Sequence, residues 1–298
     1  MYERYYGLRE RPFDLTPNPR YLFLSTMHRE ALSNLHYGIS GRKGITVLIG
    51  EAGTGKTTLV HTALEQQRED NTCAVYLSNP LLTRGEFFEF LAWGFGLDAG
   101  AETSKTRFVL ELTRTLQARQ EAGGTSALII DEAQCLPYEL MEEIRLLANI
   151  ETTTDKLLPV VMVGQPELAD RLNEPSLRQL KQRVALRCKL PALDAPETAA
   201  YISNRVHVAG GNSDQLFTAT AIDTIFEHSR GIPRTVSVIC DNALLSGFAA
   251  DERPVSRETV LEVCRDFDLP SSGAPAASMT PPLPAAAAGA APRTSSFF

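Results

Sequence analysis

An eight-residue stretch, GEAGTGKT, combines glycines, a lysine and a threonine at a spacing suited to binding phosphate groups. It runs from Gly50 to Thr57 and fits the pattern G-x-x-x-x-G-K-[ST], with a strand-like segment before it and a helix-like segment after it. The glycines let backbone N–H groups turn toward phosphate oxygens, and the start of the following helix favours the same negative charge. We predict a nucleotide site in which Lys56 contacts the β- and γ-phosphates and the Thr57 hydroxyl binds Mg²⁺. The alternative, a chance glycine-rich turn, leaves the flanking strand and helix unexplained.

Two neighbouring carboxylates lie 75 residues beyond Lys56, in the segment ALIIDEAQ. Four apolar residues precede Asp131 and Glu132, which places both acids at the end of a buried strand, where ligands bind in open α/β sheets. We predict that Asp131 positions Mg²⁺, directly or through water, and that Glu132 deprotonates the attacking water as a general base. The alternative is a pair of solvated acids. A Glu beside the Mg²⁺-binding Asp favours hydrolysis over transfer to another acceptor.

Two polar residues further along the chain are candidates for sensing a terminal phosphate. Gln165 follows the strand-like part of VMVGQPEL, where it either contacts the γ-phosphate or serves only as a turn residue. Arg234 follows Pro233 at a helix start in SRGIPRTVSVICDNAL, where the helix dipole disfavours a cation. A γ-phosphate would compensate for that placement, and we predict this contact. The alternative is an arginine simply exposed in the first turn.

A basic segment, residues 171–189, contains six Lys and Arg residues and one acid, Glu174. Within it, LRQLKQR carries Arg178 and Arg183 just before the last strand-like segment. This location suits an arginine finger, in particular Arg183, offered to the γ-phosphate of a neighbouring subunit. A strip facing nucleic acid and a plain solvated surface are the two other interpretations.

The segments that must position these residues alternate between continuous apolar strands and helices. This alternation predicts a parallel five-stranded sheet covered by helices on both faces. The expected strands are residues 44–50, 72–78, 126–133, 157–164 and 184–190. After Pro191 only helical patterns remain, which predicts a small all-helical domain. The expected organisation is an arm and first helix (1–40), an α/β nucleotide domain (41–190), a helical lid (191–268) and a disordered Ala/Pro-rich tail (269–298).

Composition and charge limit the class of protein. The 298 residues are 43% hydrophobic and 22% charged, as in a soluble globular protein with a sizeable core. A formal net charge of −7 disfavours a dedicated polyanion binder, although a local basic face is compatible with it. The charged N-terminus MYERYYGLRERPF is unlike a signal peptide, and no apolar run reaches the length of a membrane span.

Two aromatic segments have no obvious part in nucleotide chemistry. RPFDLTPNPRYLFLS, residues 11–25, is rich in proline, which favours extended chain. We predict that it wraps the nucleotide domain as an ordered arm, with its aromatic residues near the entrance to the site. EFFEFLAWGF, residues 86–95, contains the single tryptophan, Trp93. We expect it to pack in the core, with a partner-binding patch as the alternative.

Together these segments resemble the AAA+ ATPases, and the N-terminus resembles the ExeA (general secretion pathway protein A) type. The resemblance rests on YYGLRERPFDLTPNPRYLFLS, HREALSNLHYGI, GEAGTGKTTL, DEAQ, VGQPEL and GIPRTVSVICDNALL, and covers residues 5–266. It implies a P-loop AAA+ fold in which Asp131 and Glu132 serve Mg²⁺ binding and catalysis, Gln165 and Arg234 sense phosphate, and Arg183 is the finger. The implied nucleotide-binding residues of the loop are Gly50, Glu51, Ala52, Gly53, Thr54, Gly55, Lys56, Thr57 and Thr58.

The resemblance also implies a cytoplasmic ATPase that uses ATP and Mg²⁺, assembles as a ring or arc and works with a cell-envelope secretion or export system. Contact with the inner membrane would come through a partner protein. The resemblance does not extend to the transmembrane helix and peptidoglycan-binding domain of the longer members. Related stand-alone ATPases serve polysaccharide export or protein sorting, and others regulate DNA transposition. An ATP-switched DNA-binding assembly factor is therefore the alternative, whereas Glu132 and the helical lid disfavour a small-molecule kinase.

Overall fold

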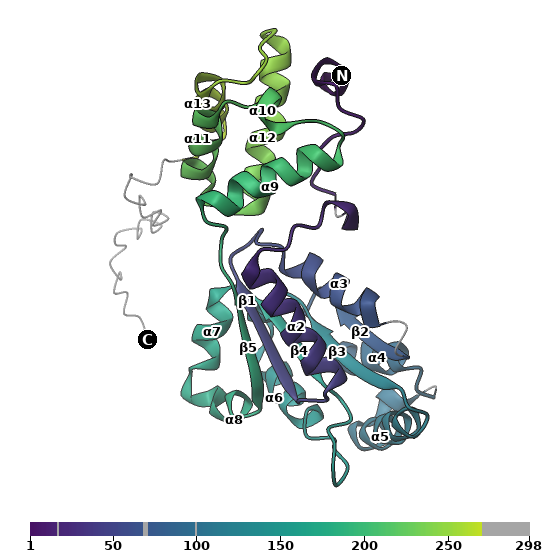
Figure 1. Ribbon diagram of the computed structural model, residues 1–298. Helices are drawn as coiled ribbons and strands as arrows, with labels where there is room; N and C mark the ends of the chain where they lie inside the picture. Colours follow the sequence, from purple (N-terminus) through teal and green to yellow (C-terminus); the bar gives the residue numbers. More distant parts are fainter. Residues whose placement is uncertain (17, 68–70, 99, 270–298) are drawn as a thin grey trace, which may run out of the picture.

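The computed structural model describes residues 1–16, 18–67, 71–98 and 100–269 (Figure 1). The tail expected at 269–298 therefore lies, from residue 270 onward, outside the described residues.

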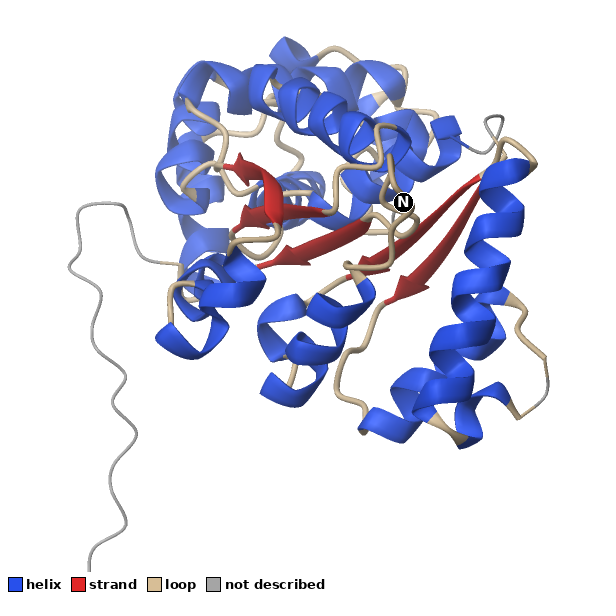
Figure 2. Ribbon diagram, turned by 90° about the horizontal axis from the view of Figure 1, so that it is seen from below, coloured by secondary structure: helices blue, strands red, loops and turns tan. Residues whose placement is uncertain are grey.

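Five parallel strands form one sheet, in the order β2-β3-β4-β1-β5 (Figure 2). The strands are β1 (Ile45–Gly50), β2 (Thr72–Leu77), β3 (Thr125–Ile130), β4 (Val160–Gly164) and β5 (Val184–Leu190). The predicted α/β fold with a parallel five-stranded sheet is confirmed. Because the strands are parallel, their carboxyl ends meet at one edge of the sheet, and the loops after β1, β3 and β4 lie beside one another there.

Strand β3 ends earlier than its apolar pattern suggested. The expected strand ran to Ala133, but β3 ends at Ile130 and Ala133 begins a short 3₁₀ helix. The N–H of Asp131 still donates to the Leu77 carbonyl at 2.9 Å, and Glu132 then turns the chain with a left-handed backbone at φ 49°. The two acids therefore project from the end of the strand.

Alternating strand residues build a core on each face of the sheet. On one face, residues such as Leu48, Ile129 and Val161 pack against α2 (Thr26–Ser40) and α3 (Lys56–Gln67). The opposite face packs against five helices: α4 (Arg84–Phe95), α5 (Lys105–Glu121), α6 (Tyr138–Leu147), α7 (Pro166–Leu172) and α8 (Arg178–Lys181). The 3₁₀ helices are η1 (Pro19–Tyr21), η3 (Ala101–Thr103), η4 (Ala133–Cys135) and η5 (Pro175–Leu177).

Five helices after β5 surround a third core, which lies beyond the carboxyl edge of the sheet (Figure 1). These are α9 (Ala195–Val208), α10 (Ser213–Leu216), α11 (Ala219–Ser229), α12 (Pro233–Ala249) and α13 (Arg257–Asp266). Helix α9 begins with a reciprocal cap in which the Asp194 carboxylate accepts from the Glu197 N–H at 2.8 Å. No helix among the described residues is long and apolar enough to cross a membrane.

The N-terminal arm packs differently from our expectation. It begins with α1 (Tyr2–Tyr6), and its buried residues Tyr6 and Phe13 belong to the core of the helical lid rather than to the nucleotide domain. The Tyr6 hydroxyl donates to the Glu252 carbonyl at 3.0 Å, and the Arg9 N–H donates to the Ala209 carbonyl at 2.8 Å. Only after these contacts does the chain cross to α2, so the arm connects the lid to the sheet.

The aromatic segment of α4 also departs from the expected core packing. Phe87, Leu91 and Phe95 are buried in the core, as expected. Trp93, however, is 83% exposed. A helix buries only the stripe that faces the sheet, and this segment has more apolar residues than that stripe accommodates.

Candidate nucleotide-binding site

The glycine-rich loop between β1 and α3 has a backbone that requires glycine. Gly53 and Gly55 have φ values of +83° and +94°, which side-chain-bearing residues rarely adopt. A Cβ at Gly53 would also lie 2.7 Å from the Cβ of Arg234, because the lid approaches the loop closely. The N–H of Arg234 donates to the Gly53 carbonyl at 3.2 Å. The loop is therefore curved, free of bulky side chains and covered by the start of α12.

Lys56 occupies the first turn of α3 and is buried. Its ammonium group donates to the carbonyls of Gly50 and Glu51, both at 2.9 Å, so the side chain folds back along the loop. Burial lowers the pKa of Lys56 below its ordinary value of 10.5, whereas the Glu132 and Asp131 carboxylates raise it. The cation is thus held where a phosphate would provide the opposite charge.

Asp131 is buried, and three donors surround its carboxylate. The hydroxyls of Thr57 and Tyr76 each donate to Oδ2 at 2.7 Å, and the N–H of Glu132 donates to Oδ1 at 2.9 Å. Burial and the hydrogen bond to Asp131 raise the pKa of Tyr76, so this phenol stays protonated and keeps donating. Tyr76 was not identified from the sequence, because nothing local in β2 distinguishes it from a packing residue.

The Thr57 and Asp131 oxygens fit a magnesium site. Both are hard oxygen donors, and their hydrogen bond shows that they converge on one point. No group of three or more His, Cys, Asp or Glu side chains in the described part of the chain could hold a metal ion. A divalent cation would therefore need phosphate or water oxygens as additional ligands, as Mg²⁺ commonly has in nucleotide sites.

Glu132 is half-buried and faces the cavity from the end of β3. Its carboxylate accepts from the side-chain amide of Gln134 and from the amide of Gln165 at 3.3 Å. The Gln165 N–H in turn donates to the Gln134 side-chain oxygen at 3.1 Å. The structure therefore brings Gln165 to Glu132, although Gln165 does not line the cavity. Gln134 lies in the DEAQ segment, but its role as a link between two strand ends was not visible from the sequence.

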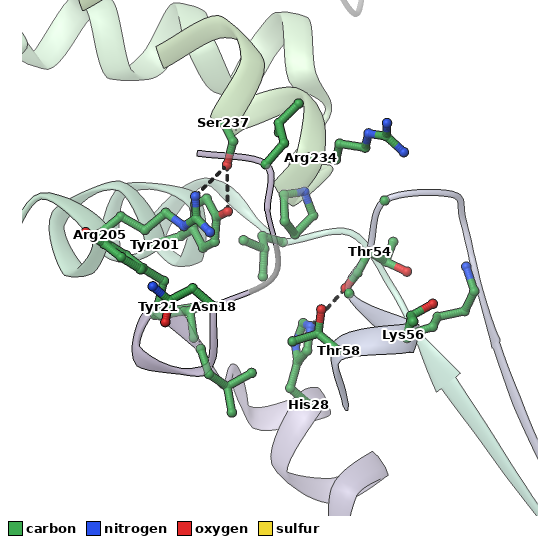
Figure 3. Close-up of a pocket in the computed structure, with 18 of the residues that line it drawn as sticks. Asn18, Tyr21, His28, Thr54, Lys56, Thr58, Tyr201, Arg205, Arg234 and Ser237 are labelled. Atoms are coloured by element: carbon green, nitrogen blue, oxygen red, sulfur yellow. Dashed lines mark hydrogen bonds between the residues drawn. The ribbon is translucent and has the colours of Figure 1, made fainter. Parts of the chain in front are cut away.

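A cavity of about 410 Å³ lies between the loop, the arm and the lid (Figure 3). Its lining combines loop residues Ala52–Thr58 and Glu132 with residues from the arm and lid. The contributing arm and lid residues include Tyr21, Phe23, His28, Tyr201, Arg205, Arg234 and Ser237. In Figure 3, Tyr21, Tyr201 and Arg205 lie toward one side of the cavity and Lys56 and Arg234 toward the other. One side thus carries two tyrosines with Arg205, and the other carries Lys56 and Arg234.

Arg205, which the sequence did not single out, ties the arm to the lid beside this cavity. Its guanidinium group lies over the rings of Tyr21 and Tyr201, 5.2 and 5.3 Å from their centroids. The same group donates to the carbonyls of Pro12 and Asp14 at 3.1 and 3.2 Å. Tyr21 therefore has a fixed place at the cavity wall, as expected for the arm's aromatic residues, but the lid holds it there.

His28 connects the first turn of α2 to the glycine-rich loop. Its Nε2 lies 3.1 Å from the Thr54 carbonyl and its Nδ1 lies 2.9 Å from the Ser25 hydroxyl. Because a carbonyl only accepts, Nε2 carries the proton and Nδ1 accepts from Ser25. Burial lowers the pKa of His28 below its ordinary value of 6.5, which favours this neutral form. The sequence contained no signal for this contact, since Thr54 lies far from His28 along the chain.

Arg183 lies at the opposite edge of the sheet from the loop. It is exposed and immediately precedes β5, and its carbonyl accepts from the N–H of Ile45 at the start of β1. The loop follows the other end of β1, about 20 Å away along a six-residue strand. Arg183 therefore does not reach the loop of its own chain.

Comparisons with known proteins agree with this fold. The AAA domain family matches residues 39–172. General secretion pathway protein A of Aeromonas hydrophila is 42% identical over 254 residues, which cover 84% of this chain and 45% of that protein. The chain thus spans about half the length of this relative.

Two solved structures resemble this fold at low sequence identity. Cdc6p of Pyrobaculum aerophilum has 15% identity and a TM-score of 0.64, and covers 86% of this chain and 70% of its own. ORC2 of Aeropyrum pernix, solved in ADPNP–ADP complexes, has 16% identity and a TM-score of 0.63, with 86% and 71% coverage. At these identities the likeness shows the fold alone.

Proposed function

Because the chain belongs to the AAA+ proteins of the ExeA type, we propose that it binds and hydrolyses ATP with Mg²⁺ to power or gate assembly of a cell-envelope secretion or export system. One observation carries the chemical part of this proposal. Lys56, the hydrogen-bonded pair Thr57–Asp131 and the carboxylate of Glu132 meet at the carboxyl edge of one sheet, beside a cavity of about 410 Å³.

Binding uses two different walls of the cavity. The loop residues Gly50–Thr58 surround the phosphates with backbone N–H groups, and Lys56 contributes the neutralising charge. Arg234 approaches from the lid, and its place beside Gly53 lets it contact the terminal phosphate. At the other wall, Tyr21 and Tyr201 provide aromatic surface for the adenine ring of the nucleotide. Closure of the lid would therefore respond to the nucleotide.

Hydrolysis requires a base positioned near the terminal phosphate. Glu132 accepts the proton of the attacking water, and the amides of Gln134 and Gln165 hold its carboxylate in position. Thr57 and Asp131 hold Mg²⁺, which supplies positive charge to the phosphate oxygens when bound. Three hydrogen bonds hold the Asp131 carboxylate in place for this task. The chemistry needs no acceptor other than water, so turnover without a second substrate would exclude a kinase.

Completion of the site requires a second copy of the chain. Arg183 is exposed at the far edge of the sheet, where it is available to the phosphate of a neighbour in a ring or arc. The envelope role rests on the secretion protein that is 42% identical to this chain. We place the protein in the cytoplasm, with an envelope protein as its partner. Genes for secretion or export beside its own gene would support the role in an envelope system, and transposase genes would contradict that role.

A second candidate function is ATP-switched DNA binding, and one structural feature favours it. Five exposed cations lie along α8 and the edge strand β5: Arg178, Lys181, Arg183, Arg187 and Lys189. Such a strip suits phosphate backbones. ATP-dependent DNA binding with a steep salt dependence would support this function, and no binding at low salt would exclude it.

The Lys56→Ala variant tests the nucleotide site directly. Loss of a charge-assisted contact to phosphate should weaken ATP binding by at least about tenfold, as measured by titration calorimetry. Lys43→Ala is the matched control, because Lys43 is exposed and lies over the ring of Tyr37, outside the cavity. ATP affinity equal to that of the parent in Lys56→Ala would contradict the assignment of the loop.

A further inference from the structure

A groove on α4, distinct from the nucleotide cavity, carries the most exposed aromatic side chain of the described residues. Trp93 is 83% exposed there, and the groove has a volume of about 520 Å³. Its lining comes from α4 and the segments on either side of it: Leu82, Glu86, Glu89, Phe90, Ala92, Trp93, Leu97, Asp98, Gly100 and Glu102. None of these residues lines the nucleotide cavity. A role for the groove is therefore independent of ATP chemistry.

Helix α4 is apolar on two sides, and the core explains only one of them. Phe87, Leu91 and Phe95 fill the space between the sheet and α5. Phe90 and Trp93 follow Glu86 and Glu89 at helical spacing on the groove side. The half-buried Phe90 and Leu97 also pack against the edge of the core, whereas Trp93 is exposed. Capping at Thr83 fixes the start of the helix, since the Thr83 N–H donates to the Glu86 carboxylate at 2.8 Å. The exposed surface is therefore a built feature on a well-defined helix.

The rim of the groove is acidic. Four carboxylates lie around it, those of Glu86, Glu89, Asp98 and Glu102, and none of the described lining residues is Lys or Arg. Of the nearby cations, Arg84 pairs with the buried Glu143 at 2.6 Å. Arg107, which lies close to Gly100, donates to the Glu111 carboxylate at 2.7 Å and also interacts electrostatically with Asp98 and Glu102, so it offsets part of the rim's negative charge. Anionic lipid and nucleic acid would be repelled by such a rim.

We propose that this groove docks a cationic amphipathic segment of a partner protein. An apolar side chain of the partner packs on Trp93 and Phe90, while its Lys or Arg residues face the four carboxylates. An exposed aromatic anchor surrounded by charges of one sign has the composition of a docking site for a segment of opposite charge. The basic edge of a second copy, on α8 and β5, is less suitable. Its Arg183 serves the nucleotide site of the neighbour in the proposed assembly.

The single tryptophan makes the groove directly observable, because Trp93 is the only one in the chain. The probe is a synthetic amphipathic helix of leucine and lysine, and its control carries glutamate in place of lysine. Binding of the lysine peptide should bury Trp93 and shift its fluorescence emission to shorter wavelength, in a saturable manner that weakens with salt. The glutamate peptide should leave the emission unchanged. An equal shift with both peptides, or none with either at low salt, would overturn the proposal.

Variants locate the binding to the groove. With a labelled lysine peptide, Trp93→Ala should lose at least about tenfold in affinity, as expected for an aromatic anchor. Glu89→Gln should lose about two- to fivefold and reduce the salt dependence. Leu110→Ala and Glu121→Gln are matched controls on the exposed side of α5 and should bind as the parent does. Unchanged ATP binding by Trp93→Ala confirms that the variant folds.

Two results would contradict the location or the occupant. Equal peptide affinity in Trp93→Ala and in the controls would place the binding outside the groove. Self-association of the parent that Trp93→Ala abolishes, measured by sedimentation without peptide, would assign the groove to a second copy of the chain instead.

Discussion

At the scale of single residues, the site depends on buried polar groups that are fully engaged with one another. Asp131 accepts from Thr57, Tyr76 and the N–H of Glu132, and this satisfies a carboxylate that would otherwise be costly to bury. Asp131 and Glu132 could be predicted as site residues from the sequence, because the two acids end an apolar run. Tyr76 and Gln134 could not, because their roles arise from pairing between neighbouring strand ends.

His28 provides a prediction about pH at this scale. The ring lies between Ser25 and the Thr54 carbonyl, and the Glu197 carboxylate slightly raises its pKa. Burial dominates and lowers the pKa of His28 below 6.5. The folded state therefore binds fewer protons than the unfolded chain once the pH falls below that value. The stabilising effect of the neutral ring is complete above about pH 6.5 and is lost progressively below it.

The measurement is the free energy of unfolding in urea between about pH 7.5 and 5.5, for the parent and for His28→Gln. Glutamine keeps an amide donor for Thr54 but does not titrate. The parent should lose more stability than His28→Gln as the pH falls. His207→Gln, at an exposed histidine, should follow the parent. Parallel curves for the parent and His28→Gln would show that His28 has the same pKa in both states.

At the scale of elements, apolar runs predicted the sheet well, because all five predicted strands form one parallel sheet. Prediction was weaker where an element has more than one apolar side. The segment of α4 contains enough aromatic residues to fill the core and still leave Trp93 outside, so periodicity alone did not identify the outer side. The end of β3 was also misplaced, because the left-handed turn at Glu132 serves the site rather than the strand.

The arm illustrates a second limit at this scale. Its prolines predicted an extended chain, whereas Pro19 begins the 3₁₀ helix η1, and they do not specify which surface the chain will cover. Tyr6 and Phe13 are each 1% exposed in the lid core, which forms from helices about two hundred residues later in the sequence. A single sequence does not indicate such a pairing. Arg205, which holds the arm carbonyls of Pro12 and Asp14, was missed for the same reason.

At the scale of the whole molecule, one edge of the sheet carries the nucleotide site and the opposite edge carries Arg183. This arrangement predicts a site shared between two copies. Arg183→Ala should lower ATP turnover by about a thousandfold, as loss of an arginine finger does. Mixing it with Glu132→Gln should restore part of the activity, because an Arg183→Ala copy still has its own Glu132 and can receive Arg183 from the other variant. Phosphate release measures the turnover.

Arg178→Ala is the matched control, because Arg178 is an exposed arginine in the same basic segment. It should hydrolyse ATP at the parent rate. Two variants that remain inactive when mixed would contradict a shared site, as would parental turnover by Arg183→Ala alone.

The most direct test of the proposed ATPase is steady-state hydrolysis by Glu132→Gln, with ATP affinity measured on the same preparation. Glutamine preserves the shape of the side chain but removes the base. The variant should bind ATP as the parent does while its turnover falls by at least about a hundredfold. Glu65→Gln, at an exposed acid outside the cavity, should retain parental turnover. Hydrolysis by Glu132→Gln at the parent rate would contradict the assignment of Glu132 as the general base.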